Sequence, residues 1–181
     1  MCSSDLKWDL RRYLGDLGHG YESAVFTVCD FNHIGREINR KGLLRADETH
    51  RVQGPKPVYF AVQHMASLFD NRLERVPGAA ASVMGRESYC YACRRTDGSG
   101  GLAVAWDRSG VPSERTAPEP GSIIVRGLPF REPVYCELIS GEVYELPEGA
   151  FHQEGDVALF REIPLWDSPV VVAEKSILPL A

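Results

Sequence analysis

No stretch of this 181-residue sequence approaches the roughly 18 consecutive apolar residues that a membrane-spanning helix requires. A basic stripe and a basic amphipathic helix are also lacking, and the net charge of −5 is spread along the chain. The sequence therefore suggests neither nucleic acid nor a membrane surface as a partner. Internal repeats and low-complexity segments are absent as well. With 44% hydrophobic and 25% charged residues, the composition is that of an ordinary globular protein.

Cysteine is scarce and its count is odd: Cys2, Cys29, Cys90, Cys93 and Cys136. An odd set, mostly within apolar stretches, indicates reduced thiols rather than a disulfide framework, which favours a reducing, cytoplasmic compartment. Cys90 and Cys93 have the spacing of half a zinc site, but no second Cys/His pair follows at a suitable distance. Positions three apart in a strand point to opposite faces, so we expect neither a metal site nor a redox motif there.

A secretory leader is not recognisable, because residues 1–6 contain neither a basic segment nor an apolar one. This hexapeptide resembles the peptides that translated sequencing-adapter DNA gives, and we set it apart from the expected fold. An amphipathic helix follows almost at once, with no strand before it. We therefore expect the native N-terminus to lie upstream, in which case the missing leader says nothing about secretion.

The first 75 residues combine helical and strand-like patterns. Leucine and tyrosine recur at spacings of three and four over 5–17, which predicts a helix with one apolar face. Residues 23–31 form a near-continuous apolar run, the pattern of a strand buried on both faces, as in a parallel sheet. The polar stretch 32–55 is long for a loop in a compact domain and is a candidate for function. Pro57 then opens a second predicted helix, which ends near residue 69.

Beyond residue 75, short β-type runs alternate with turn signals. Seven runs are expected to form the strands of an antiparallel sandwich: 88–95, 101–107, 122–125, 134–139, 142–146, 157–163 and 169–173. We therefore predict two domains, residues 1–75 and a β-sandwich over 76–181. A single parallel-type strand cannot form a sheet, because its backbone groups and both its faces need partners. Those partners are expected either in the β-domain or upstream of the chain.

Several segments together resemble the end of retaining clan-A glycoside hydrolases. Gly-Leu-Leu-Arg at 42–45 and Pro-Lys-Pro-Val-Tyr-Phe-Ala at 55–61 resemble the segment after the eighth barrel strand and the start of the next helix. Residues 8–14 and 20–26 resemble the seventh helix and the eighth strand. The runs that resemble the β-sandwich closing many of these enzymes are 132–135, 139–144 and 163–170. The fold that this resemblance implies is an α+β fragment, in which the last helix, strand, loop and helix of a (β/α)8 TIM barrel precede an antiparallel β-sandwich.

The resemblance also implies a function. The parent enzyme would hydrolyse O-glycosidic bonds of an oligo- or polysaccharide, its carbohydrate substrate, without a metal or organic cofactor. Retaining enzymes use two carboxylates about 5 Å apart, one as acid/base and one as nucleophile. In the family these residues follow the fourth and seventh strands, so the resemblance places both upstream of residue 1. We therefore assign no catalytic residue, and we expect the fragment alone to be inactive.

The end of the eighth strand faces the active site in such barrels. The resemblance therefore assigns substrate binding to Asp30, Phe31, Asn32 and His33. Asp30 could bind a sugar hydroxyl, cap a turn or pair with Arg36. Phe31 could stack on a pyranose or pack in the core, and His33 could bind substrate or simply be solvated. Members of the family often have a tryptophan near this position, and this sequence has no tryptophan there.

Two other functions stay open. A non-catalytic carbohydrate-binding module would carry an exposed, coplanar aromatic pair on the sandwich, and core packing is the alternative use of the same side chains. The candidates for that pair are Trp106, Trp166, Tyr89, Tyr91 and Tyr144. A small complete α+β protein of unrelated function would instead pair residues 24–30 within the sheet of the β-domain.

Overall fold

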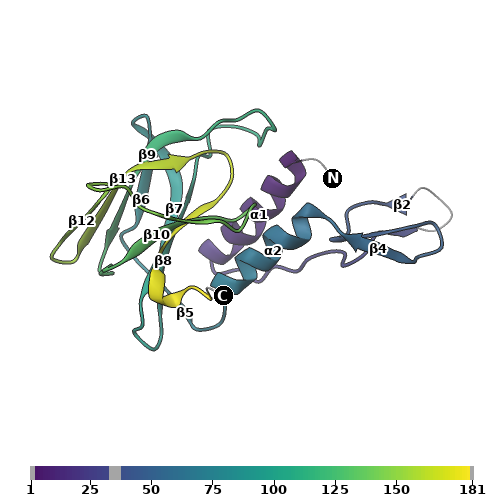
Figure 1. The fold of residues 1–181 in the computed structure, drawn as a ribbon, viewed down its shortest axis with the longest axis horizontal. Helices are drawn as coiled ribbons and strands as arrows, with labels where there is room; N and C mark the ends of the chain where they lie inside the picture. The colour runs from purple at the N-terminus through teal and green to yellow at the C-terminus, as the bar shows by residue number, and fades with distance from the viewer. Residues whose placement is uncertain (1–2, 33–37, 180–181) are drawn as a thin grey trace.

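Antiparallel β-structure dominates the computed structural model, which describes residues 3–32 and 38–179. Helices α1 (Ser3–Gly18) and α2 (Pro57–Leu68) lie side by side between a large sheet and four short strands (Figure 1). The short strands are β1 (Phe31–Asn32), β2 (Ile38–Asn39), β3 (Leu44–Ala46) and β4 (Val52–Pro55). The strands of the large sheet are β5 (Leu73–Val76), β6 (Ala80–Val83), β7 (Arg86–Arg95), β8 (Gly101–Trp106), β9 (Glu119–Arg126), β10 (Pro133–Glu137), β11 (Val143–Glu145), β12 (Phe151–Glu154), β13 (Val157–Leu165) and β14 (Val170–Glu174), and a 3-10 turn, η1 (Lys175–Ile177), follows.

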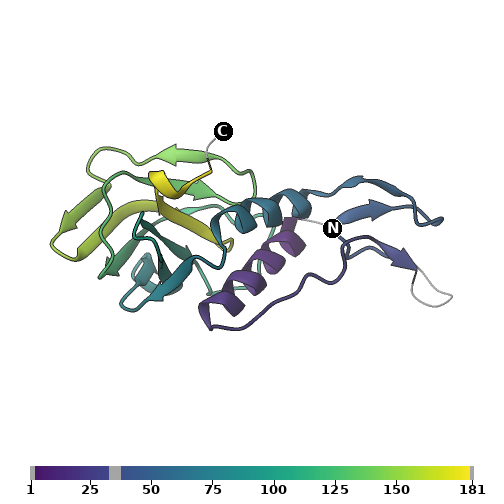
Figure 2. The ribbon, with the colours of Figure 1, turned by 90° about the horizontal axis from the view of Figure 1, so that it is seen from below.

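The large sheet curls back on itself. Its strand order is β11-β10-β14-β8-β7-β6-β9-β13-β12, with β5 paired to β7, and all of these pairs are antiparallel. The long strand β7 serves both halves, because residues 86–88 pair with β6 and residues 89–94 pair with β8. The two halves consequently face each other as layers, as Figures 1 and 2 show from two directions.

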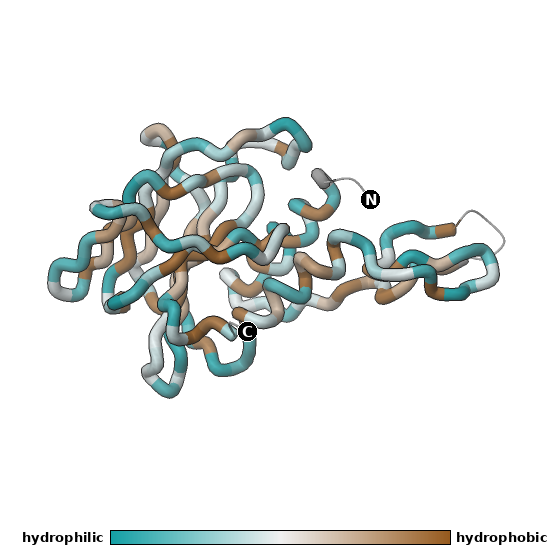
Figure 3. The backbone as a smooth tube through the Cα atoms, in the orientation of Figure 1, coloured by the Kyte–Doolittle hydropathy of each residue, from teal (hydrophilic) through white to brown (hydrophobic). Residues whose placement is uncertain are grey.

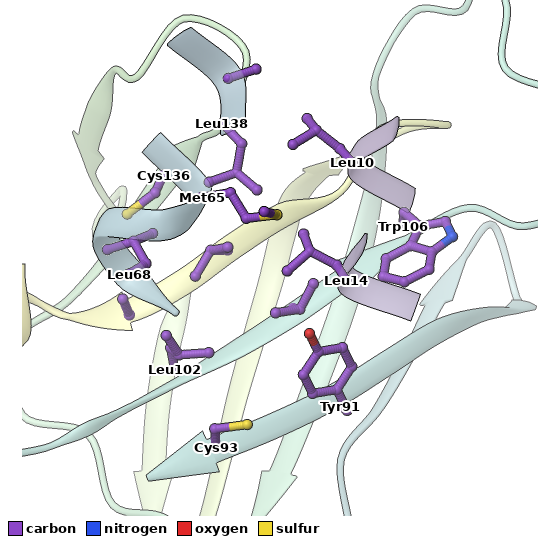
Figure 4. Packing of buried hydrophobic residues seen from close by; sticks show 14 of the residues in the cluster. Leu10, Leu14, Met65, Leu68, Tyr91, Cys93, Leu102, Trp106, Cys136 and Leu138 are labelled. Atoms are coloured by element: carbon purple, nitrogen blue, oxygen red, sulfur yellow. The ribbon is translucent and has the colours of Figure 1, made fainter. Parts of the chain in front are cut away.

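Side-chain alternation gives the sheet two apolar cores. The core between the halves includes Ile123, Val125, Phe160, Ile163, Leu165 and Val172. The opposite face of β7, β8, β10 and β14 packs against both helices (Figure 4). Cys90 packs against the first core and Cys93 belongs to the second, so the two thiols lie on opposite faces of β7, as strand periodicity predicts. Burial raises the pKa of Cys90 to about 12 and that of Cys93 to about 11.

Each helix buries one apolar stripe against this second face. In α1 the stripe is Leu6, Leu10 and Leu14, four residues apart, and all three are almost completely buried. In α2 it consists of Val58, Ala61, Met65 and Leu68, and Pro57 occupies the first turn, where its missing N–H costs nothing. Burying one leucine side chain contributes about 1.5–3 kcal/mol, so the stripes account for much of the attachment of the helices.

The expected fold class, an α+β fragment with the end of a (β/α)8 barrel beside a β-sandwich, is wrong. The described residues form a mostly antiparallel β protein with two α-helices, and its large sheet contains no parallel pair. The leucine and methionine stripes are covered by the face of the antiparallel sheet, not by a parallel sheet. The run at 23–31 lies outside the large sheet, bends at Phe26 and Val28, and forms one isolated parallel bridge, Cys29 with Leu44, so no parallel sheet develops in the described chain.

Continuous structure also crosses the domain boundary that the sequence predicts at residue 75. Strand β5 crosses residue 75 and pairs with β7. The core beneath the helices joins residues from both sides of that position. The division into two domains therefore stays a prediction. At the N-terminus, α1 begins at Ser3 and Leu6 is 4% exposed, so part of the hexapeptide that we set apart belongs to the helix.

A buried ion pair attaches α1 to the sheet. Lys7 Nζ lies 2.6 Å from Asp167 Oδ1 and also donates to the carbonyl oxygen of Ser113 at 2.7 Å. The ammonium sits 4.3 Å from the centroid of the Trp166 ring. Burial alone would raise the pKa of Asp167, but hydrogen bonds from Lys7, Thr116 and the Ser113 backbone lower it overall. This contact joins residues 160 positions apart.

The Asp167→Asn variant should lower the free energy of unfolding by about 3–5 kcal/mol, because the Lys7 ammonium would stay buried without a counter-charge. The folded-state pKa of Asp167 lies below its unfolded value. The stabilisation is therefore present above the unfolded pKa and is lost as the pH falls through the folded pKa. Urea titrations from neutral to acidic pH measure both effects. The control is Asp16→Asn, whose partner Arg12 is exposed, and an equal loss in both variants at neutral pH would contradict the prediction.

Candidate functional site

Of the residues assigned to substrate binding, Asp30, Phe31 and Asn32 belong to an arm, residues 21–32 and 38–56, that extends away from the large sheet (Figure 1). Figures 1 and 2 agree that the arm reaches beyond the ends of both helices. Two short antiparallel pairs, β1 with β2 and β3 with β4, make up its described strands. Figure 3 shows hydrophobic stretches along the arm as well as in the body of the molecule.

Asp30 is the best-anchored side chain of the arm, with 3% of its surface exposed. Its Oδ1 accepts hydrogen bonds from Lys56 Nζ and from the Gly42 N–H, the latter at 3.1 Å, and its Oδ2 faces the Ala46 N–H at 3.4 Å. Lys56 Nζ also donates to the carbonyl oxygen of Arg40 at 2.8 Å. Burial would raise the pKa of Asp30, but Lys56 and the two backbone N–H groups lower it overall. Both carboxylate oxygens are thus engaged within the chain, which gives Asp30 a positioning role in the arm.

The two motifs that carry the resemblance meet at this carboxylate. Gly42 opens Gly-Leu-Leu-Arg, and Lys56 is the centre of Pro-Lys-Pro. The Lys56 N–H donates to the carbonyl oxygen of Leu43 at 2.9 Å. A Cβ on Gly42 would lie 2.2 Å from the carbonyl carbon of Cys29, so the chain can cross here only at a glycine. Lys56 was not predicted as the partner of Asp30. The only sequence signal for it was that the lysine lies in the Pro-Lys-Pro motif that contributes to the resemblance.

The other assigned residues follow Asp30 directly. Phe31 begins β1, is half-buried and meets Phe26 edge-on, with ring centroids 5.8 Å apart. Asn32 pairs with Ile38 across β1 and β2. His33, like Arg36, lies outside the described residues. Sugar binding by Asp30, Phe31, Asn32 and His33 therefore stays a prediction.

The run predicted to be a strand buried on both faces is exposed. Phe26 is 77% exposed and Val28 is 60% exposed, and residues 21–24 are exposed as well. Residues 24–30 form no pair with the large sheet, contrary to what a small self-contained α+β protein would require. Strand-like apolar sequence is thus present without the burial that normally accompanies it.

Among the described residues, main-chain hydrogen bonds join this run to the rest of the arm only from Thr27 onward. The carbonyl oxygens of Thr27 and Val28 accept from the N–H groups of Leu43 and Leu44 at 3.2 and 2.8 Å, and the Asp30 N–H donates to the carbonyl oxygen of Leu44 at 3.0 Å. The bridge beside these bonds is parallel. Within residues 3–32 and 38–179, no main-chain bond reaches the other edge at Val28. We call residues 23–28, with their unpaired side, the apolar edge.

A hollow of about 620 Å3 opens between α1 and the arm. Its lining includes Trp8 and Tyr13 from the helix and Phe26 from the apolar edge. Trp8 is 49% exposed, so the hollow has aromatic side chains that solvent reaches. The apolar edge thus borders a hollow of mixed character, because the lining also includes charged side chains: Asp5, Asp9, Arg40 and Lys41.

The aromatic residues considered for a sugar platform do not form an exposed coplanar pair in the described chain. Tyr91 and Trp106 are buried beneath the helices, and the ring of Tyr89 stacks on Trp106 with centroids 4.3 Å apart. Trp166 is partly buried, and Tyr144 is the one exposed member of the set. Core packing is therefore the use that the structure makes of most of them.

In the part of the chain that the structure describes, no three His, Cys, Asp or Glu side chains are grouped so that they could hold a metal ion. None of the described helices is both long and apolar enough to cross a bilayer. Comparison of the chain with protein-family models, curated proteins and solved structures gives no match. Function therefore has to be inferred from the chain's own residues and their geometry.

The Asp30→Asn variant should release the arm locally. The uncharged amide cannot balance the buried Lys56 ammonium, and breaking such a pair costs about 3–5 kcal/mol. We expect the amides of Gly42 and Ala46 to lose protection in hydrogen exchange, while those of β8 and β14 keep theirs. Asp47→Asn is the matched control, because Asp47 lies in the same arm but bonds only exposed groups nearby. Unchanged protection at Gly42 in the Asp30→Asn variant would show that the ion pair does not hold the arm.

Proposed function

We propose that this chain is the non-catalytic part of a retaining glycoside hydrolase, and that its arm contacts the catalytic part. The observation that carries the proposal is the apolar edge, an exposed run with a strand-like sequence that, in the described chain, is hydrogen-bonded through its main chain to the rest of the arm only from Thr27 onward. Three of the segments that resemble the glycosidases, 20–26, 42–45 and 55–61, lie in the arm or at its ends. Their order in the chain is that of the resemblance, and Asp30 joins two of them in space.

The distribution of exposed apolar side chains supports this proposal. Of the large hydrophobic residues that are exposed, most lie in the first 60 residues: Trp8, Leu17, Tyr21, Phe26, Val28, Val52, Tyr59 and Phe60. Contiguous exposed apolar surface marks sites of contact with other protein segments. Full burial of Phe26 or Val28 would contribute about 1.5–3 kcal/mol for each side chain. Tyr21, Phe26, Val28 and Val52 belong to the arm itself, which thus exposes as many large apolar side chains as the whole described chain beyond α2.

The arm is also held in a defined position. The ion pair of Asp30 and Lys56 and the tight crossing at Gly42 fix the edge beside the start of α2. A preformed surface loses little conformational entropy on association, which favours a specific contact. Asp30, Phe31 and Asn32 follow the edge closely in the chain, so a partner that covers the edge lies next to them. That position agrees with the substrate-binding role that the resemblance assigns to them.

The chemistry of retaining hydrolysis must then come from the partner. It needs one carboxylate that is free to attack carbon and another that holds a proton, about 5 Å apart. Asp30 is the only carboxylate of the assigned site, and Lys56 and backbone N–H groups neutralise it. A carboxylate with a lowered pKa and both oxygens bonded is a poor acid and a hindered nucleophile. Residues 1–181 alone should accordingly bind and position rather than catalyse.

The proposal is tested by joining the chain to the polypeptide encoded immediately upstream. The extended protein should hydrolyse aryl glycosides, and residues 1–181 alone should not. A 2-fluoroglycoside, which traps the glycosyl-enzyme of retaining enzymes, should label a carboxylate outside residues 1–181, as read by peptide mass spectrometry. Phe26→Asp should lower kcat/KM about tenfold or more, which corresponds to 1.4 kcal/mol. Val111→Asp, an exposed residue outside the arm, is the control. An inactive extended protein, or label within residues 1–181, would refute the proposal.

A second prediction concerns the isolated chain. Because its apolar edge is exposed, we expect residues 1–181 to associate with themselves at micromolar to millimolar concentrations, as exposed apolar segments do. Replacing both Phe26 and Val28 by serine should shift sedimentation-velocity profiles toward the monomer. The matched control replaces Met84 and Val111, which are 74% and 73% exposed and lie outside the arm. If the control variant dissociates and the edge variant does not, the edge is not the contact surface.

A further inference from the structure

A second hollow, which we call the groove, lies between α1 and the strands β7 and β8. Its volume is about 540 Å3, within the range of about 300–1,000 Å3 that is usual for small-molecule sites. Its lining combines the aromatic side chains Trp8, Tyr89 and Trp106 with the cationic side chains Arg11, Arg12 and Arg108. The groove was not expected from the sequence, because its residues come from positions almost 100 apart in the chain.

The lining of the groove holds more cations than carboxylates. Three arginines line it beside one carboxylate, Asp9, whereas the chain carries a net charge of −5. Asp16 and Glu87, which pair with Arg12 and Arg108, are not part of the lining. Positive charge that no neighbouring carboxylate cancels attracts anions to a cleft and strengthens their binding there.

Among the three arginines of the groove, Arg11 is the one whose positive charge is least balanced by a paired carboxylate. Its Nη1 donates to the carbonyl oxygen of Gly110 at 3.0 Å, and no carboxylate in the described chain lies within ion-pair distance of it. Burial lowers the pKa of Arg11, and the charges of Asp167 and Asp107 partly offset this effect. Those two carboxylates already have cations of their own. A partly buried guanidinium that bonds only a carbonyl retains free N–H groups for an anion.

Arg12 and Arg108 differ from Arg11 because each has an acidic neighbour. Arg12 pairs with Asp16 at 2.6 Å, and Arg108 meets Glu87 at 3.5 Å. The side chains of Arg108 and Glu87 are 57% and 90% exposed, so this long contact is easily exchanged for another anion. Arg11 and Arg108 are thus the two guanidinium groups best able to receive a ligand.

Aromatic rings supply an apolar wall beside these charges. Tyr89 stacks on Trp106, and the ring of His19 lies 5.6 Å from that of Tyr89. Trp8 is half exposed, and the guanidinium of Arg11 lies 5.6 Å from its ring centroid. The negative face of such a ring packs well against the C–H groups of a sugar ring. Ring and cation therefore lie close enough to contact one ligand together.

We propose that the groove binds a sugar ring that carries an anionic group, a carboxylate or a sulfate ester. The anion would accept hydrogen bonds from Arg11 and Arg108, and the ring would pack against Trp8 and Tyr89. The choice of a sugar rests on the proposed function, whereas the choice of an anion rests on the arginines alone. The site is a binding subsite separate from the arm, and no bond is made or broken in it.

The test is a titration of residues 1–181, folded and without any catalytic partner, followed by 1H–15N NMR. The probes are digalacturonate, galactose 6-sulfate, neutral lactose and inorganic sulfate. We expect saturable shifts at groove residues with one or both anionic sugars, and weaker binding of lactose and of free sulfate. The comparison of the two anionic sugars identifies which anion the groove prefers. Affinity should fall as salt is added.

Variants separate the contributions of charge and ring. Arg11→Gln with Arg108→Gln should weaken binding of the anionic sugar about tenfold or more, as expected when charge-assisted hydrogen bonds are lost. Arg126→Gln with Arg161→Gln removes two exposed arginines outside the groove and should leave the affinity unchanged. Trp8→Ala should weaken binding of the sugar but not of sulfate.

Three results would overturn the inference: no saturable binding, equal affinity for lactose, or affinity unaffected by the Arg11/Arg108 pair. Equal binding of sulfate and the anionic sugars would refute the sugar part. None of these outcomes depends on hydrolysis, so a failure here is distinguishable from a failure of the proposed function.

Discussion

The ion pair of Asp30 and Lys56 is the interaction on which the arm depends. A carboxylate that is 3% exposed needs a counter-charge and hydrogen-bond donors, and Lys56, Gly42 and Ala46 supply them from three parts of the chain. Because these partners lie in the polar stretch and at the start of α2, one side chain draws the arm into a single arrangement. The apolar edge, residues 23–28, ends two residues before Asp30. The anchored carboxylate therefore fixes the direction in which the exposed side of the edge faces.

A second buried ion pair, Lys7 with Asp167, also fixes the position of one segment relative to another. It ties α1 to the turn between β13 and β14, while Asp30 and Lys56 tie the arm to α2. The two helices, packed on the sheet through their apolar stripes, form a layer between the two pairs. Such pairs add little net stability compared with apolar replacements, but they fix which segments meet. The arm is therefore positioned relative to the curled sheet, although it shares little of the core.

Local structure could be predicted from the sequence far better than its assembly could. The alternating run at 88–95 is β7, the run at 101–107 is β8, and both helices lie where their periodicity places them. The fold class was wrong because an apolar stripe tells that a face is buried and not what covers it. The burial predicted for residues 23–31 failed for the same reason, since it depends on neighbours that pattern does not specify. Asp30 was singled out through the resemblance, near the end of the predicted strand, but its ion-pair partner Lys56, 26 residues later, was not.

Helix α1 shows why the arm and the groove have to be considered together. Its leucine stripe packs against the sheet, so the residues on its other sides can line other features. Trp8 borders both the groove and the hollow beside the arm, and Asp9 borders both as well. A helix that served only to cover the sheet would present solvated side chains there, whereas α1 presents an indole that is 49% exposed. Any segment that covers the apolar edge must therefore pack next to a residue that also forms a wall of the groove.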